Sequence, residues 1–109
     1  LRGIDFSETD LRKADLRKSN LAKVKFFRAD LRKTLFTEAN LTEAYLSSAW
    51  LQDTDLQWAN LSKAILRYSV NLTSTQIQSA KIDRETKVPH YLKIHWTSET
   101  DFRCEEKAE

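Results

Sequence analysis

The side chains with the strongest nucleophilic or metal-binding chemistry lie near the end of the chain. His90, His95 and Cys104 are the only two imidazoles and the only thiol in the 109 residues. A thiol beside a histidine can form a nucleophilic pair, and both groups bind transition metals. Their spacing matches no metal-ligand or nucleophile motif, and no glycine-rich phosphate loop is present. We therefore expect no enzyme activity, no metal site and no cofactor.

A second kind of chemistry belongs to the basic start of the chain. Residues 1–33 hold ten Lys and Arg against five Asp and Glu, whereas the whole chain has a net charge of only +2. This asymmetry predicts a surface for an acidic protein partner. A solvated surface is the alternative, because aspartates lie among the basic residues. The predicted basic partner surface consists of Arg12, Lys13, Arg17, Lys18, Arg32 and Lys33.

A five-residue period organises the chain that must position these side chains. The fourteen positions at intervals of five from Leu1 to Leu66 are all Leu or Phe, and the residue two places before each is mostly Ala, Ser or Thr. A period of five fits neither a helix at 3.6 nor a strand at 2, because both would scatter the apolar side chains. A coil that turns a corner every five residues places them all inside. The period therefore predicts a solenoid.

The repeated motif resembles that of the pentapeptide-repeat family, whose consensus is approximately Ala-(Asp/Asn)-Leu-X-X. The resemblance covers about residues 1–82 and implies an all-β fold, a right-handed quadrilateral β-helix of about four coils with twenty residues in each. The clearest matches are Ala14-Asp15-Leu16, Ala29-Asp30-Leu31, Ala39-Asn40-Leu41 and Ala59-Asn60-Leu61.

The sequence supports a twenty-residue coil independently of this resemblance. Asn20, Asn40 and Asn60 would fall in one column, where stacked amides can hydrogen-bond along the axis. Arg12 would likewise stack on Arg32, and Lys13 on Lys33. Like charges would then lie next to each other, and an acidic partner would relieve their repulsion.

The period shifts once near the end of the repeats. Leu72 follows Leu66 after six residues, and Ile77 and Ile82 then resume the interval of five. We expect a bulge or widened corner at 68–71 and a last coil through residue 82 that keeps the repeat geometry. Residues 83–109 are expected to form a C-terminal cap and tail that pack on the last coils. Within them, alternating apolar residues predict a short strand at 92–96.

A set of aromatic residues occupies outward positions of the later coils. Such an exposed apolar surface is typical of a contact. We expect the chain's own tail to cover it, through Tyr91, Leu92, Ile94, Trp96 and Phe102; a partner or a second copy of the chain is the alternative. The predicted partner or tail-docking residues are Tyr45, Trp50, Trp58 and Tyr68.

These features predict a non-catalytic structural scaffold or protein–protein interaction module of bacterial type, either free-standing or part of a longer polypeptide. Its expected partner is a protein, with a homodimer through a helix end or the aromatic residues as an alternative. Nucleic acid and membrane are disfavoured, and the lack of a signal peptide or transmembrane segment favours the cytoplasm. The resemblance also implies a rival function, a DNA-mimicking topoisomerase (gyrase) inhibitor or protection protein. Such mimicry requires an acidic rod, whereas this chain is net positive.

Overall fold

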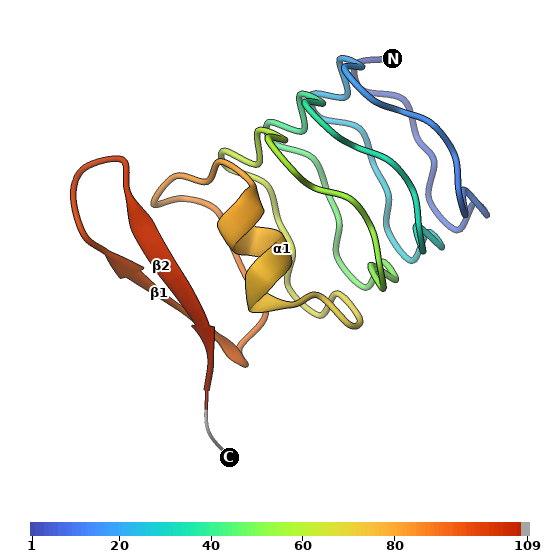
Figure 1. Ribbon diagram of the computed structural model, residues 1–109. Coiled ribbons are helices and arrows are strands. Elements are labelled where there is room, and N and C mark those ends of the chain that lie inside the picture. Colours follow the sequence, from blue (N-terminus) through green and yellow to red (C-terminus); the bar gives the residue numbers. More distant parts are fainter. Residues whose placement is uncertain (108–109) are drawn as a thin grey trace.

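The backbone winds into stacked coils whose corners recur every five residues (Figure 1). This computed structural model describes residues 1–107. Each pentapeptide closes one tight turn, in which the carbonyl of the leading Leu or Phe accepts from the N–H three residues later. The Ala14 N–H, for example, donates to the Leu11 carbonyl at 3.0 Å. One turn for each pentapeptide brings every leading side chain to the inside.

The corners are turned almost entirely without glycine. Fourteen residues other than glycine have φ between 57° and 63°, and all except Asn71 occupy the second position after a leading Leu or Phe. Side chains normally disfavour this left-handed region, at a cost of roughly 1–2 kcal/mol per residue. At every such corner except that of Gly3, the chain therefore accepts backbone strain and presents an outward side chain.

Successive coils are joined by parallel bridges between residues twenty apart as far as Val70, and by the bridges Asn60–Lys81 and Ile65–Lys87 beyond it. Asn20 pairs with Asn40, and Asn40 pairs with Asn60. The Asn40 Nδ2 donates to the Asn20 Oδ1 at 3.4 Å. On another wall, the Asp30 N–H donates to the Thr9 carbonyl at 3.0 Å. These contacts confirm the predicted stacking of residues twenty apart.

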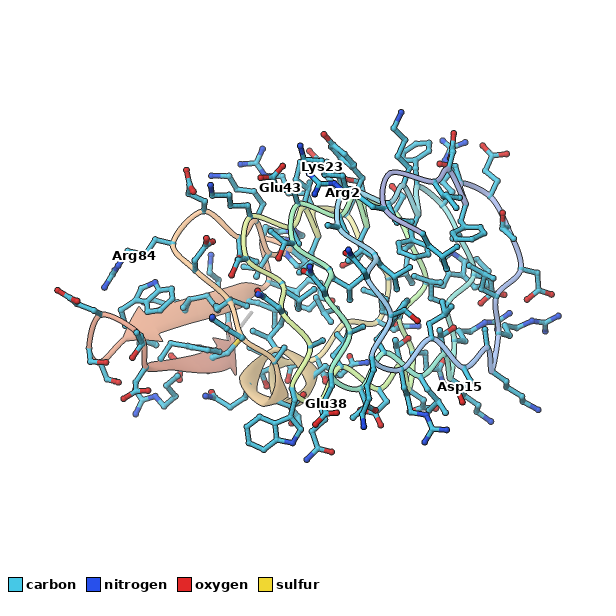
Figure 2. The ribbon with its side chains drawn as sticks, turned by 90° about the horizontal axis from the view of Figure 1, so that it is seen from above. Arg2, Asp15, Lys23, Glu38, Glu43 and Arg84 are labelled. Atoms are coloured by element: carbon cyan, nitrogen blue, oxygen red, sulfur yellow. The ribbon has the colours of Figure 1, made fainter. Side chains whose placement is uncertain are left out.

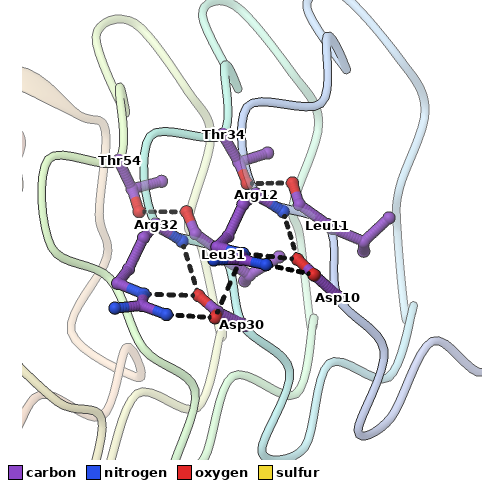
Figure 3. Close-up of polar contacts among 8 residues, drawn as sticks. All are labelled: Asp10, Leu11, Arg12, Asp30, Leu31, Arg32, Thr34 and Thr54. Carbon is purple, nitrogen blue, oxygen red and sulfur yellow. Dashed lines mark hydrogen bonds and ion pairs between the residues drawn. The ribbon is translucent and has the colours of Figure 1, made fainter.

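The interior is filled by the repeated apolar residues. Leading residues from Leu21 to Leu66 are at most 2% exposed, whereas Leu1 on the first coil is 55% exposed. Thr34 and Thr54 also point inward, and their hydroxyls donate to the carbonyls of Leu11 at 2.7 Å and Leu31 at 2.6 Å (Figure 3). Each buried hydroxyl thus links two neighbouring coils.

The last coil departs from the repeat. Residues Ser74–Ser79 form the helix α1, so the prediction that the repeat geometry and an all-β fold continue through this segment was wrong. Thr73 caps the helix in a capping box with Gln76, whose Nε2 also donates to the carbonyls of Leu51 at 2.7 Å and Thr54 at 2.9 Å. Ile77 is fully buried. The capping box therefore favours a helix at this point of the repeat, and the helix still buries Ile77 in the interior.

A two-stranded antiparallel hairpin follows the coils. Its strands are β1, Leu92–Trp96, and β2, Phe102–Glu106. The predicted strand at 92–96 is confirmed, whereas its partner β2 was not predicted. The side chain of Gln78 in α1 accepts from the Cys104 N–H and donates to the Phe102 carbonyl, both at 2.8 Å. It therefore acts like a neighbouring strand and fixes the hairpin against the helix.

The hairpin lies beyond α1 at the end of the stack, opposite the N-terminus (Figure 1). Leu92 and Cys104 are buried in the same apolar cluster as the coils. The division into a β-helix of residues 1–82 and a tail of residues 83–109 stays a prediction, and residues 108–109 lie outside the described part. No helix among the described residues is long and apolar enough to span a bilayer.

Candidate protein-binding surface

Four of the six predicted basic residues lie together at one corner of the stack. Arg12, Lys13, Arg32 and Lys33, which we call the basic corner, line a groove of about 280 Å³ with Gln52 and Asp53 of the next coil. Backbone bonds hold the column in register, because the Lys13 N–H donates to the Arg32 carbonyl and the Lys33 N–H to the Gln52 carbonyl, both at 3.1 Å. Arg17 and Lys18 follow Asp15 around the coil and do not line the groove.

Each arginine of the basic corner is held by the aspartate two residues before it. The Arg12 guanidinium donates to both carboxylate oxygens of Asp10, at 2.9 Å from Nε and 2.7 Å from Nη2 (Figure 3). Arg32 binds Asp30 in the same way, at 2.9 and 2.6 Å. Such bidentate pairs fix the guanidinium plane. Both arginines are therefore oriented in advance.

These pairs also keep the carboxylates ionised. The hydrogen bond from Arg12 lowers the pKa of Asp10 to about 2, and the bond from Arg17 does the same to the pKa of Asp15. The Arg32 side chain likewise lowers the pKa of Asp30. At neutral pH, a carboxylate therefore offsets much of the charge of each arginine.

The lysines of the basic corner differ from the lysines at the other corners, Lys18, Lys23 and Lys63. Within residues 1–107, neither Lys13 nor Lys33 has a carboxylate within 4.0 Å of its ammonium group. By contrast, the Lys18 Nζ lies 3.7 Å from a carboxylate oxygen of Glu38, and Lys23 lies 3.8 Å from Glu43. Figure 2 shows Lys23 and Glu43 side by side. Lys13 and Lys33 are thus the unpaired positive charges of the groove.

The predicted aromatic residues do not form one wall, and the tail does not cover them. Exposed fractions are 43% for Tyr45, 46% for Trp50, 69% for Trp58 and 78% for Tyr68. Tyr45 and Trp50 belong to two different bridged columns, while Trp58 and Tyr68 occupy two different corners. These exposed fractions contradict the expectation of tail cover. The hairpin packs on α1 at the end of the stack, and Trp58 borders it in an open groove shared with Phe102.

One aromatic residue is linked to the basic corner. The Arg32 guanidinium carbon lies 4.7 Å from the ring centroid of Trp50, within range of a cation–π contact. Sequence reasoning did not predict this contact or the arginine–aspartate pairs. The repeated Asp-Leu-Arg triplets at 10–12, 15–17 and 30–32 were the signal for those pairs.

The tail residues with catalytic potential are engaged structurally. The His95 Nε2 lies 2.8 Å from a carboxylate oxygen of Glu105, across the hairpin. Burial raises the pKa of the Cys104 thiol to about 11, so the thiol is protonated at neutral pH. Across the described residues, no group of three or more His, Cys, Asp or Glu side chains is placed to hold a metal ion.

Comparison with known proteins identifies the repeat. A family model for pentapeptide repeats matches residues 1–38 and 39–70, with eight copies of the repeat. The chain belongs to the pentapeptide-repeat family. Proteins of this family form right-handed quadrilateral β-helices, in agreement with the bridged coils, and no catalytic family is indicated. The search of curated proteins found no match.

Several solved structures are similar to this chain. HetL of the cyanobacterium Nostoc sp. strain PCC 7120, described as involved in heterocyst differentiation regulation, is 35% identical with a TM-score of 0.58, over 64% of this chain and 29% of HetL. The protein alr5209 of Nostoc PCC 7120 is 31% identical with a TM-score of 0.47, over 79% of this chain and 74% of alr5209. QnrB1, a plasmid-mediated fluoroquinolone resistance protein, is 21% identical with a TM-score of 0.47, over 73% of this chain and 37% of QnrB1. This chain therefore spans less than a third of HetL.

Proposed function

We propose that this chain is a non-catalytic scaffold that binds a protein partner through the outward side chains of its coils. The observation that carries the proposal is the unpaired charge of Lys13 and Lys33 in a groove whose arginines are already fixed by aspartates. Such a surface offers two ammonium groups to an anionic partner.

The backbone ladder makes such a surface suitable for binding. Each outward residue is attached to a coil that is hydrogen-bonded to its neighbours twenty residues away. A partner would therefore order few additional backbone dihedrals of this chain. Because ordering costs reduce affinity, a preorganised surface favours binding.

HetL, described as involved in heterocyst differentiation regulation, is similar to this chain, and our proposal for this chain is a regulatory role carried out through protein contacts. We also propose that the repeat region contains about four coils and that the protein is located in the cytoplasm. A second copy of this chain, bound at a helix end or at the exposed aromatic residues, is the alternative to a different protein.

A capture experiment tests the scaffold proposal. Immobilised wild-type protein would be incubated with extract from the cells that produce it, and retained proteins would then be purified and titrated against it. Two variants carry the comparison: Arg12, Lys13, Arg32 and Lys33 changed to Ser, and Tyr45 with Trp50 changed to Ser. Lys18→Ser with Lys23→Ser serves as the control for a general loss of positive charge.

The scaffold proposal expects stoichiometric binding of at least one purified protein that one of the two test variants weakens and the control variant does not. Circular dichroism would verify that all variants stay folded. A partner whose affinity is equal for all variants would contradict the proposal, as would chemical conversion of a bound molecule by the wild-type chain.

A further inference from the structure

We propose that the basic corner binds an acidic segment of the protein partner, with two neighbouring carboxylates lying over the ammonium groups of Lys13 and Lys33. This inference rests on the proposed scaffold function and adds the chemistry of the partner. It concerns a protein segment in an extended conformation that follows the direction in which the coils stack.

The charge order of the other corner columns makes the basic corner exceptional. Along one corner, charges alternate through Lys23, Glu43, Lys63 and Glu85, with carboxylate contacts at 3.8 Å for the first pair and 3.7 Å for the last. At another corner, Lys18 faces Glu38 at 3.7 Å. Alternation satisfies the charges within the chain itself.

The basic corner stacks like charges instead. Lys13 lies under Lys33, on coils joined by the 3.1 Å bond from the Lys13 N–H to the Arg32 carbonyl. The arginine column is compensated, because one Asp30 oxygen lies 3.6 Å from the Arg12 Nε and 2.6 Å from the Arg32 Nη2. Like charges placed directly opposite each other on paired strands repel. This repulsion lowers the stability of the free protein. A partner carboxylate above each lysine would replace the repulsion with attraction, which favours binding of an acidic partner.

The boundaries of the groove limit the length of the acidic segment. Asp53 occupies the lysine column on the next coil, and Gln52 occupies the arginine column. A carboxylate of the partner would be repelled at Asp53, whereas an amide or a cation would be accepted there. The groove therefore suits two acidic residues followed by a neutral or basic one.

The same boundaries favour a protein segment over nucleic acid. A nucleic acid carries negative charge along its whole length and needs a longer basic track. Here Asp10 and Asp30 lie behind the arginines, Asp53 closes one end, and the net charge of the whole chain is only +2. Two unpaired lysines match a short acidic stretch.

Trp50 adds a second feature of the expected segment. Its ring contacts Arg32 and is 46% exposed beside the basic corner. An apolar side chain next to the acidic pair would pack against this ring. We therefore expect recognition of acidic residues that adjoin an apolar one.

A peptide titration tests the acidic-segment inference. The probe is a short synthetic peptide with two glutamates at alternate positions next to a leucine, added to the full ¹⁵N-labelled chain at low salt. Its counterpart carries glutamine in place of both glutamates. Binding should shift the amide signals of residues 12–13, 32–33 and 52–53, and should weaken as salt screens the charges.

Matched double variants isolate the two lysines. Lys13→Gln with Lys33→Gln should weaken peptide binding about tenfold, because each exposed ion pair contributes at most about 1 kcal/mol. Lys18→Gln with Lys23→Gln removes the same charge from paired lysines elsewhere and should leave the affinity within about twofold of wild type. Wild-type protein should bind the glutamine peptide no more tightly than the Lys13→Gln, Lys33→Gln variant binds the glutamate peptide.

Three results would overturn the inference: no shift at the basic corner at millimolar peptide, equal affinity of the two double variants, or tighter binding of a short DNA duplex at the same lysines. The scaffold proposal would survive any of these if the captured partner still binds and is weakened by Tyr45→Ser alone, because Tyr45 lies in a different bridged column from Trp50. Failure of both experiments would remove both proposals.

Discussion

The guanidinium carbon of Arg32 lies 4.7 Å from the ring centroid of Trp50 on the following coil. Asp30 holds the same guanidinium through two hydrogen bonds and is itself bridged to Trp50 in the wall. These three side chains form one fixed unit across two coils. An arginine that the sequence presents as a free cation is therefore held within the structure, whereas the adjacent Lys33 has no carboxylate partner among the described residues.

The ion pair of Asp10 with Arg12 should be visible in the pH dependence of the carboxyl groups. The hydrogen bond from Arg12 lowers the folded-state pKa of Asp10 to about 2, below the usual 3.8. The pair consequently stabilises the folded state above about pH 4, and this contribution is lost as the pH falls towards 2. Carboxyl NMR titration should give midpoints near 2 for both Asp10 and Asp15.

Arg12→Gln should raise the pKa of Asp10 towards 3.8 and leave that of Asp15 at about 2, since Arg17 still pairs with Asp15. Asp15 thus serves as the internal control. An Asp10 midpoint that does not respond to the substitution would show that Arg12 is not the cause of its low pKa.

Glycine substitutions at two adjacent serines should distinguish the relief of corner strain from the general effect of glycine on the free energy of unfolding. Ser48 has φ of 60°, whereas its neighbour Ser47 is not among the residues with positive φ. Ser48→Gly should raise the free energy of unfolding by a few tenths to about 1 kcal/mol, because glycine adopts this conformation without strain. Ser47→Gly should lower it by roughly 0.5–1 kcal/mol through lost chain entropy. Urea denaturation of both variants measures the difference, and the same sign for both would contradict this account of the corners.

Gln76 should be important for the closure of the last coil. Its side chain donates to the carbonyls of Leu51 and Thr54 and accepts from the Thr73 N–H at 2.8 Å. Gln76→Ala should lower the free energy of unfolding by about 1–3 kcal/mol, because it leaves these backbone groups with fewer partners. Thermal or urea denaturation measures this loss. Gln57→Ala, at an exposed position, should change it by no more than about 0.5 kcal/mol.

The sequence predicts which residues of this architecture point inward, but it does not predict the backbone conformation at every point of the repeat. The five-residue period assigns Leu21 or Phe36 to the interior without ambiguity, since neither a helix nor a strand buries such a series. The same interval could not distinguish a coil from α1, because Ile77 is buried in either. Only the Thr73–Gln76 capping box marks the helix, and it is a local signal within a long repeat.

The candidate site was less predictable for a related reason. Sequence identifies Lys13 and Arg12 as equally basic, but only the conformation of the corner brings Arg12 back to Asp10 and leaves Lys13 unpaired. The position of the tail likewise depended on β2, whose sequence Phe-Arg-Cys-Glu-Glu reads as mostly polar. Without β2, the sequence predicts that the apolar face of β1 covers the aromatic residues of the coils, whereas the structure places the hairpin beyond α1 at the end of the stack.

The DNA-mimic alternative predicts inhibition of gyrase, and the charge of this chain opposes it. Mimicry requires a negative rod, whereas the basic corner presents two unpaired lysines and the chain as a whole is +2. We expect no change in gyrase supercoiling at a large molar excess of this protein, measured by gel electrophoresis of plasmid DNA. Inhibition that persists after Lys13 and Lys33 are changed to Gln would support the mimic instead.

The central claim, a rigid scaffold that binds through its outward side chains, is tested most directly by an NMR titration of the ¹⁵N-labelled chain with its purified captured partner. The account predicts signal changes at outward positions around the basic corner, or around Tyr45 and Trp50, with the signals of inward residues such as Leu41 and Ala59 unchanged. Changes throughout the inward positions would contradict it, because they would mean that the partner remodels the coils. Changes confined to His90, His95 and Cys104 would also contradict it.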